Sequence, residues 1–139
     1  MKTEIFSYLP ECACEIRKKV FIDEQGFTTE FDETDKIAVH PVAFDDNGTP
    51  LATCRIFKGD EDGVFVLGRL AVVKEARGKH LGNTLINEVE KYVKQNGGKC
   101  IILHAQQRVK EFYNKAGFKE FGDIEYDEGC PHIRMKKYV

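Results

Sequence analysis

The sequence predicts one α/β (α+β) domain in which helices flank a mixed, mostly antiparallel central sheet. A chain of 139 residues has the length of a single domain, so we expect one domain over residues 1–139. Segments with the two-residue period of strands alternate with segments of helical period, which excludes an all-α or an all-β protein. Asp46-Asn47-Gly48 is a strong hairpin signal and indicates antiparallel pairing of the strands around it.

The first half of the chain is expected to contain one helix and three strands. Pro10 suits the first position of a helix, and the apolar residues after it have helical spacing, so a helix is predicted over residues 10–22. The acidic stretch 23–35 is expected to be a loop or a short irregular helix. Strands are predicted over residues 36–44, 50–57 and 64–73. Pro41 lies inside the first of them and points to a bulge.

The second half is expected to alternate helices and strands. The third strand, residues 64–73, is almost entirely apolar and is expected to be central in the sheet. An amphipathic helix follows and ends at Asn96-Gly97-Gly98, with apolar residues four apart at Leu81, Leu85, Val89 and Val93. The remaining elements are a buried strand over residues 99–105, a short helix over 107–116, and strands over 118–126 and 132–139. Pro131 is expected to form the bend between these last two strands.

Composition and charge exclude several classes of protein. The formal net charge is −2, and a general nucleic-acid binder normally carries a basic excess, so no nucleic-acid partner is expected. No apolar run approaches the 18 residues of a membrane span, so no membrane partner is expected. Five cysteines without paired spacing argue against a disulfide framework and favour a cytoplasmic protein. No metal site is expected, because the cysteines and acidic residues lack metal-binding spacing.

One segment has the composition of an anion-binding site. A buried strand runs into a basic, glycine-containing loop, residues 77–80, which opens the amphipathic helix. The N-terminus of a helix offers backbone N–H groups and the positive end of the helix dipole, so phosphate binds well there. The phosphate loop with Gly-Lys-Ser/Thr and the pattern Gly-x-Gly-x-x-Gly are both absent. From these residues alone, the loop is either a phosphate cradle or an ordinary turn.

The segment Arg77-Gly78-Lys79-His80-Leu81-Gly82 resembles the Q/R-x-x-G-x-G/A motif of the GCN5-related N-acetyltransferases (GNAT). Residues 112–118 resemble the L/F-Y-x-x-x-G-F segment of that family. Residues 20–25, 38–40, 104–106 and 129–132 further resemble its small ElaA/YjcF-like branch. The resemblance covers nearly the whole chain and implies a GNAT-like fold, with coenzyme A (acetyl-CoA) as cosubstrate and no metal.

The resemblance also implies which residues bind the cofactor. The backbone of the strand end and the turn after it would hold the pantetheine arm, the acetyl group and the pyrophosphate, and four more positions match the family in later segments. The cofactor-binding candidates are Leu70, Ala71, Val72, Arg77, Gly78, Lys79, His80, Leu81, Gly82, Asn83, Gln106, Phe112 and Lys115. His80 departs from the family's usual glycine, and Gln106 stands where many relatives have Asn.

The catalytic candidates are Tyr113, His40 and Glu24. The resemblance implies that Tyr113 protonates the leaving thiolate, and its alternative role is that of an aromatic residue packed in the last helix. A general base is harder to identify. His40, Glu24, Asp32 and His104 are candidates, and a lone histidine among apolar strand residues is more often structural.

Six acidic residues between positions 23 and 35 leave two interpretations open. They attract a cationic acceptor, or they form a solvated loop. The function implied by the resemblance is transfer of acetyl from coenzyme A to a primary amine of a small molecule or peptide, by direct attack in a ternary complex. The alternative is a non-catalytic, regulatory acyl-CoA-binding module on the same fold. The oligomeric state is left open between monomer and homodimer.

Overall fold

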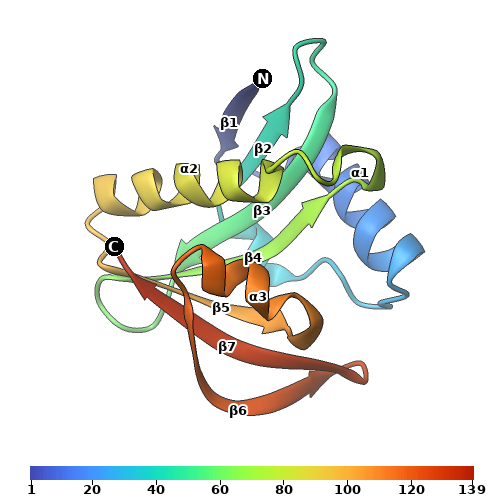
Figure 1. Ribbon diagram of the computed structural model, residues 1–139. Coiled ribbons are helices and arrows are strands. Elements are labelled where there is room, and N and C mark those ends of the chain that lie inside the picture. Colours follow the sequence, from blue (N-terminus) through green and yellow to red (C-terminus); the bar gives the residue numbers. More distant parts are fainter. The chain divides into compact units, whose positions relative to one another are not determined.

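The computed structural model describes all residues from Met1 to Val139 and confirms the predicted α/β fold (Figure 1). The seven strands form one mixed sheet in the order β1-β2-β3-β4-β5-β7-β6. The chain divides into two compact units, an N-terminal unit of residues 1–57 and 67–89 and a C-terminal unit of residues 58–66 and 90–139. This division does not test the expectation of one domain, which stays a prediction.

The N-terminal unit begins with a strand that the sequence analysis did not predict. β1 (Lys2–Phe6) pairs with β2 (His40–Phe44) in antiparallel register, with Ile5 opposite Pro41. Five residues with no fully buried member give too weak an alternation to be recognised. β2 starts at His40 rather than at residue 36, because a 3-10 helix, η2 (Glu33–Lys36), precedes it. The irregularity expected at Pro41 lies further on, between Ala43 and Phe44.

The first predicted helix begins as an α-helix and continues as a π-helix. α1 (Glu11–Arg17) continues into a π-helix, η1 (Lys18–Glu24), so the helical stretch starts and ends within two residues of the prediction. The buried side chains have helical spacing and are Ala13, Ile16, Arg17, Val20 and Phe21. Arg17 is the charged residue among them. A buried arginine on an apolar helix face needs a carboxylate partner nearby.

The strand at the centre of the sheet order leads to the predicted loop. β3 (Pro50–Lys58) is followed by β4 (Val64–Val72), in which Phe65, Leu67 and Ala71 are buried. A 3-10 helix, η3 (Lys74–Ala76), and the turn after it connect β4 to α2 (Leu81–Gln95). The apolar stripe predicted for α2 is confirmed, because its members Leu81, Leu85, Val89 and Val93 are all buried.

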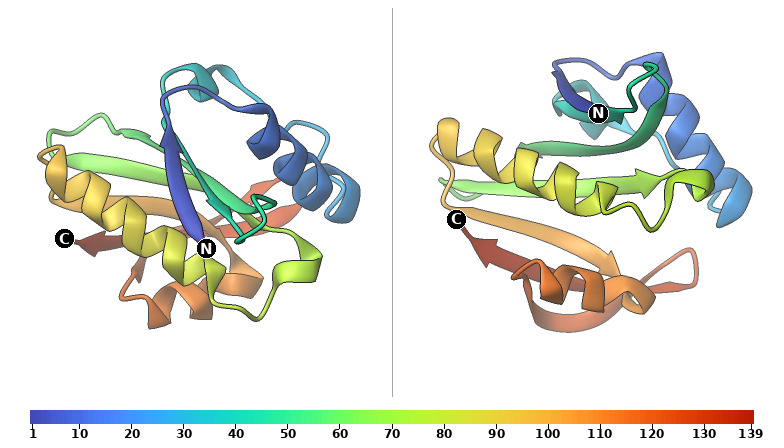
Figure 2. Two further views of the ribbon diagram at one scale, coloured as in Figure 1. Left: turned by 90° about the horizontal axis from the view of Figure 1, so that it is seen from above. Right: turned by 45° about the horizontal axis from the view of Figure 1, so that its top comes forward.

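The C-terminal unit is a three-stranded antiparallel sheet with one short helix against it (Figures 1 and 2). Its elements are β5 (Cys100–Gln106), η4 (Gln107–Val109), α3 (Lys110–Lys115), β6 (Lys119–Asp127) and β7 (Cys130–Tyr138). The expected bend at Pro131 is wrong, since Pro131 lies inside β7 opposite Tyr126. The turn falls at Glu128 and Gly129, which both have positive φ. None of the chain's helices is long and apolar enough to cross a membrane.

Candidate active site

The connection between β4 and α2 contains two residues in the left-handed backbone region. Gly78 has a φ of 84° and His80 a φ of 60°. A left-handed residue is least costly when it is glycine. This explains why the family motif usually has glycine at the position of His80. His80 therefore keeps the backbone conformation of that position while it adds an exposed side chain.

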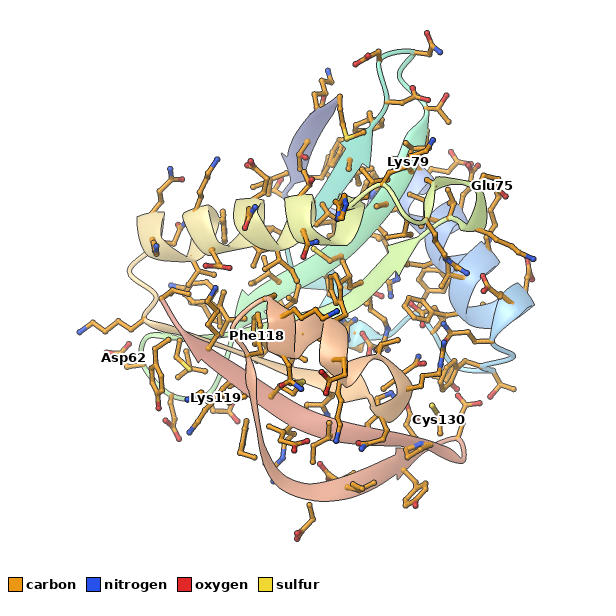
Figure 3. The ribbon with its side chains drawn as sticks, viewed as in Figure 1. Asp62, Glu75, Lys79, Phe118, Lys119 and Cys130 are labelled. Carbon is orange, nitrogen blue, oxygen red and sulfur yellow. The ribbon has the colours of Figure 1, made fainter.

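The same connection presents backbone N–H groups and an exposed lysine just before the helix. The first helical hydrogen bond of α2 runs from the Thr84 N–H to the His80 carbonyl at 3.1 Å. The N–H groups of residues 81–83 therefore precede the hydrogen-bond ladder of the helix, as at any helix N-terminus. Lys79 is exposed, and Figure 3 labels it on this connection together with Glu75. The arrangement suits an anion such as a pyrophosphate.

Two predicted site residues form an ion pair with each other. The Arg77 guanidinium donates to both carboxylate oxygens of Glu24, at 2.6 and 2.7 Å. Its Nε–H also donates to the carbonyl of Val72 at 3.1 Å. The hydrogen bond with Glu24 raises the pKa of Arg77 above its ordinary value. Arg77, predicted to bind cofactor, and Glu24, predicted to be a base, thus neutralise each other in this structure.

Two of the six acidic side chains in the acidic segment, Glu30 and Asp35, are buried, and the other four are exposed. Most of its carboxylates bind arginines of the same unit. Besides the Glu24–Arg77 pair, one connected network contains Arg17, Arg55, Arg69, Glu30, Asp32 and Asp35. Four of these six side chains are buried, and no other charged residue of the chain is. The buried pair Glu30 and Asp35 is therefore structural, while the two interpretations of the exposed part of the segment stay predictions.

Arg17 and Asp35 lie at the centre of the network. The Arg17 guanidinium donates to Glu30 Oε2 at 2.8 Å and to Asp35 Oδ1 at 2.8 Å. Arg55 donates to the same Asp35 oxygen at 2.9 Å and to Asp32 Oδ1 at 2.6 Å. Burial alone would raise the pKa of Asp35, but the hydrogen bonds that it accepts outweigh burial and lower its pKa to about 2.

His40 is fully buried beside this network. Its exposure is 0%, and its Nε2 lies 2.9 Å from the carbonyl oxygen of Asp35. Burial lowers the pKa of His40 below the ordinary value. A general base must touch the proton that it removes, and a side chain without exposed surface favours the structural alternative. The catalytic role of His40 stays a prediction, whereas His104, on β5, is exposed.

The C-terminal unit contains the predicted acid. Tyr113 lies on α3, is 9% exposed, and meets the rings of Phe112 and Phe118 edge-on at centroid distances of 5.0 and 6.0 Å. The expected aromatic packing is therefore present, and the role as an acid stays a prediction. Gln106, at the end of β5, accepts a hydrogen bond from the Arg108 Nε–H at 3.0 Å. Lys115 is exposed at the end of α3.

The main feature that the sequence analysis missed is the set of arginine partners. Arg17 falls between Ile16 and Val20 on the buried face of its helix, and Arg55 falls between two buried residues of β3. A charged residue at a position where the apolar period predicts burial is a signal for a buried ion pair. The sequence contained that signal, but the partners lie 13 to 39 positions away along the chain.

One hollow of the structure lies away from the predicted site residues. A polar hollow of about 260 Å³ is lined by residues 58–65, Asn96 and Gly97 in the C-terminal unit, and no predicted site residue lines it. No group of three or more His, Cys, Asp or Glu side chains is arranged to hold a metal ion.

Comparisons with known proteins agree with the architecture. The family described as acetyltransferase (GNAT) domain matches residues 10–139. The chain is 31% identical over 125 residues to YjcF of Bacillus subtilis (strain 168), an N-acetyltransferase named as uncharacterised, and the match covers 88% of this chain and 87% of YjcF. The crystal structure of Escherichia coli ElaA superposes on this structure with a TM-score of 0.86 at 24% sequence identity. The superposition covers 98% of each chain.

A more distant neighbour has been solved with coenzyme A. An aminoglycoside 6'-N-acetyltransferase in complex with coenzyme A superposes with a TM-score of 0.76 at 17% identity, over 99% of this chain and 97% of that one. At that identity the likeness concerns the fold alone. The family match over most of the chain, together with the relatives YjcF and ElaA, shows that the chain belongs to the GNAT acetyltransferase family.

Proposed function

We propose that this protein is an acetyl-CoA-dependent N-acetyltransferase that transfers acetyl to a primary amine of a small molecule or peptide. The observation that carries the proposal is the turn after β4, with its left-handed backbone at Gly78 and His80 and the N-terminus of a 15-residue helix directly behind it. Membership of the acetyltransferase family supports the same activity.

Coenzyme A would bring the acetyl group as an activated thioester. The N–H groups of residues 81–83 and the exposed Lys79 would bind its pyrophosphate. Because Glu24 engages the Arg77 guanidinium, we assign Arg77 to shaping the turn rather than to a direct phosphate contact. The backbone of Leu70 and Val72 would hold the pantetheine arm. From the C-terminal unit, Gln106, Phe112 and Lys115 remain candidates for further cofactor contacts.

The chain's own residues would serve the transfer in two ways. A backbone N–H of the 70–72 segment would donate to the thioester carbonyl, where negative charge develops when the amine nitrogen attacks. As the carbon–sulfur bond breaks, the Tyr113 hydroxyl would donate its proton to the leaving sulfur. Such an acid typically contributes about 10²–10⁴-fold to the rate.

Two of the four base candidates, Glu24 and His40, are engaged elsewhere, which favours an amine that needs little help to lose its proton. A lysine-type amine with a pKa of about 10.4 costs about 4.6 kcal/mol to deprotonate at pH 7, whereas an α-amine near 7.8 costs about 1 kcal/mol. Glu24 is bound to Arg77 and His40 is buried. If either acts as the base, it must first leave these surroundings, so an amine of low pKa is the acceptor class we expect.

Release of coenzyme A thiol from acetyl-CoA across a panel of amines tests the activity. The panel contains polyamines, amino sugars, aminoglycosides, free amino acids, and peptides with α-amine or lysine acceptors, and the chain's five cysteines are subtracted as background. Turnover on one class establishes the enzyme and names its acceptor. Saturable acetyl-CoA binding without turnover on any class favours the alternative, a non-catalytic acyl-CoA-binding regulatory module. Absence of binding contradicts both.

Replacing Tyr113 tests the acid. We expect Tyr113→Phe to lower turnover by at least about tenfold while the affinity for coenzyme A changes little, because the hydroxyl acts only on the leaving group. Tyr126, a 72% exposed tyrosine of the same unit, provides the matched control as Tyr126→Phe. Equal turnover in Tyr113→Phe and wild type would leave Tyr113 with its packing role alone.

Filling the turn tests the binding site for the cofactor. We expect Gly82→Trp to abolish binding of coenzyme A in calorimetry, since a bulky side chain would occupy the space next to the first helical N–H groups. Asn87→Trp, at an exposed position of the same helix, should bind normally. Wild-type affinity in Gly82→Trp would contradict this location of the site.

The cellular setting completes the proposal. All five cysteines are free thiols, which is the usual state in a reducing compartment. We therefore propose a cytoplasmic enzyme whose partners are a small-molecule or peptidyl amine, with no nucleic acid and no membrane. Monomer and homodimer both remain open, and the concentration dependence of the mass in solution distinguishes them.

A further inference from the structure

One residue inside β4 has an unusual backbone conformation. Arg69 has a φ of 53°, in the left-handed region, although it lies in the middle of a nine-residue strand. A residue with a side chain adopts this conformation at a cost, and it persists only where its surroundings hold it there. The residue just before it is Gly68, whose own φ is not positive, so Arg69 itself takes up the irregular conformation.

The side chain of Arg69 is bound at two points of the acidic segment. Its Nε–H donates to the backbone carbonyl of Glu30 at 3.1 Å and lies 3.1 Å from Glu30 Oε2. One terminal nitrogen donates to Asp32 Oδ2 at 3.3 Å. Arg69 is 27% exposed, and the Glu30 side chain that it contacts is 4% exposed. Contacts of a guanidinium with buried carboxylates are stronger than those on an open surface.

The groups that hold Arg69 are themselves fixed. Glu30 is bound by Arg17 at 2.8 Å, and Asp32 is bound by Arg55 at 2.6 Å. The network has three arginines and three carboxylates, so every buried charge has a partner of opposite sign. Arg69 is therefore connected to a rigid anchor and not to a mobile loop side chain.

A second arginine holds the other end of the same short segment. Arg77 donates through Nε to the Val72 carbonyl at 3.1 Å and through its terminal nitrogens to Glu24. Residues 70–72 thus lie between two arginines, and both arginines bind carboxylates of the acidic segment 23–35. A left-handed residue turns the peptide planes after it out of the regular strand pattern, so the direction of the next N–H groups depends on Arg69.

We propose that Arg69 is a positioning residue, which fixes through Glu30 and Asp32 the direction of the backbone N–H groups of residues 70–72 toward the thioester carbonyl. This inference rests on the proposed function, in which those N–H groups hold and polarise the thioester. The acidic segment then serves the reaction indirectly, because it anchors the strand that meets the acetyl group. Phosphate binding at residues 78–83 does not require it.

The test separates binding of coenzyme A from handling of the acetyl group. In Arg69→Gly the backbone keeps access to a positive φ but loses its anchor. We expect affinity for coenzyme A within about threefold of wild type and turnover at least about tenfold lower. With acetyl-CoA labelled with ¹³C at the carbonyl, the carbonyl signal of the bound thioester should move back toward its position in free solution. A role confined to stability would not produce that shift.

Two further variants guard against simple unfolding. Asp32→Asn keeps Arg69 but weakens its anchor, and we expect the same changes at a smaller size. Glu33, the exposed residue that follows Asp32 at the start of η2, pairs only with Lys36 among the ion pairs of the chain, so Glu33→Gln should behave as wild type. Amide hydrogen exchange of residues 69–72, measured without ligand, should be faster in Arg69→Gly and unchanged in Glu33→Gln.

The outcomes distinguish the two proposals. If wild type neither binds acetyl-CoA nor turns over, the proposed function fails and the positioning role fails with it. If wild type is active and Arg69→Gly keeps turnover, carbonyl signal and hydrogen exchange unchanged, the positioning role alone is overturned. A parallel loss of affinity and turnover that follows the loss in melting temperature would also overturn it, in favour of a purely structural arginine.

Discussion

The two units of this chain are stabilised by different kinds of contact. All four buried charged residues belong to the N-terminal unit, where they form one network with Asp32 and Arg69. The C-terminal unit buries apolar residues on alternate positions of its strands, such as Leu103 opposite Met135. Removing one partner of a buried ion pair leaves the other charge buried and unpaired, which costs much stability. Truncating one side chain of an apolar face costs an amount that depends on the cavity left behind. The N-terminal unit should therefore be the less tolerant of single charge removals.

Removing one arginine from the network should have the largest effect. Arg17→Ala leaves Glu30 and Asp35 buried without their closest partner, and we expect a loss of about 3–5 kcal/mol in the free energy of unfolding. In the C-terminal unit, Lys137→Ala removes a half-buried lysine that binds Glu90 and the Ala116 carbonyl. We expect it to cost only about 1 kcal/mol. Urea unfolding measures both, and equal losses would contradict the comparison.

Acid should weaken the N-terminal unit first. The pKa of Asp35 is about 2 in the fold and 3.8 in the unfolded chain. A carboxyl whose pKa falls on folding stabilises the fold above its unfolded pKa, and this stabilisation is lost as the pH falls from about 4 through about 2. For Asp35 the contribution is about 2 kcal/mol. Burial raises the pKa of Glu30, which acts in the opposite direction and reduces the net change.

Hydrogen exchange and a single variant check this prediction. Between about pH 4 and about pH 2, amide exchange should accelerate more in residues 11–57 than in residues 100–138, after correction for the intrinsic rate. In Asp35→Asn the unfolding free energy should depend less on pH over the same range, because the titrating group is gone. A pH dependence as steep in Asp35→Asn as in wild type would exclude Asp35 as its source.

The smallest effect is expected at two non-glycine residues with a positive φ, one in each unit. His80 in the N-terminal unit and Glu128 in the C-terminal unit have φ values of 60° and 50°. Glycine relieves the strain of a left-handed residue, so His80→Gly and Glu128→Gly should each raise stability by up to about 1 kcal/mol. Thermal unfolding measures both. His80→Gly should also keep its affinity for coenzyme A, and a loss there would mean that the His80 side chain binds the cofactor.

The difference between the units also explains what could be predicted from the sequence. The strands and the hairpin of the C-terminal unit depend on alternation and on local turns, and so does the apolar stripe of α2. These patterns lie within a few residues, and their predictions were confirmed except for the bend at Pro131. The network of the N-terminal unit joins residues such as Arg69 and Asp32, 37 positions apart. No local period encodes such a pair, so the ion pairs of the acidic segment were not predicted, and its role was left open between attraction of a cationic acceptor and a solvated loop.

Only part of the candidate site could be predicted from the sequence. The turn with Gly78 and its place before a helix followed from residue types and spacing. The φ of His80 and the engagement of Glu24 by Arg77 did not, because one depends on backbone detail and the other on a fold contact between residues 53 positions apart. The roles of Tyr113 and of the cofactor-binding residues stay predictions.

The closed charge network also constrains how this sequence can change over generations. A single substitution of Arg17 or Asp35 passes through a state with an uncompensated buried charge. We therefore expect relatives that abandon the network to have replaced several of its members together by apolar residues of similar volume. Exposed pairs such as Glu33 with Lys36 should drift one residue at a time. The network would then be inherited or lost as a block, and its presence would mark lineages that share this way of building the N-terminal half.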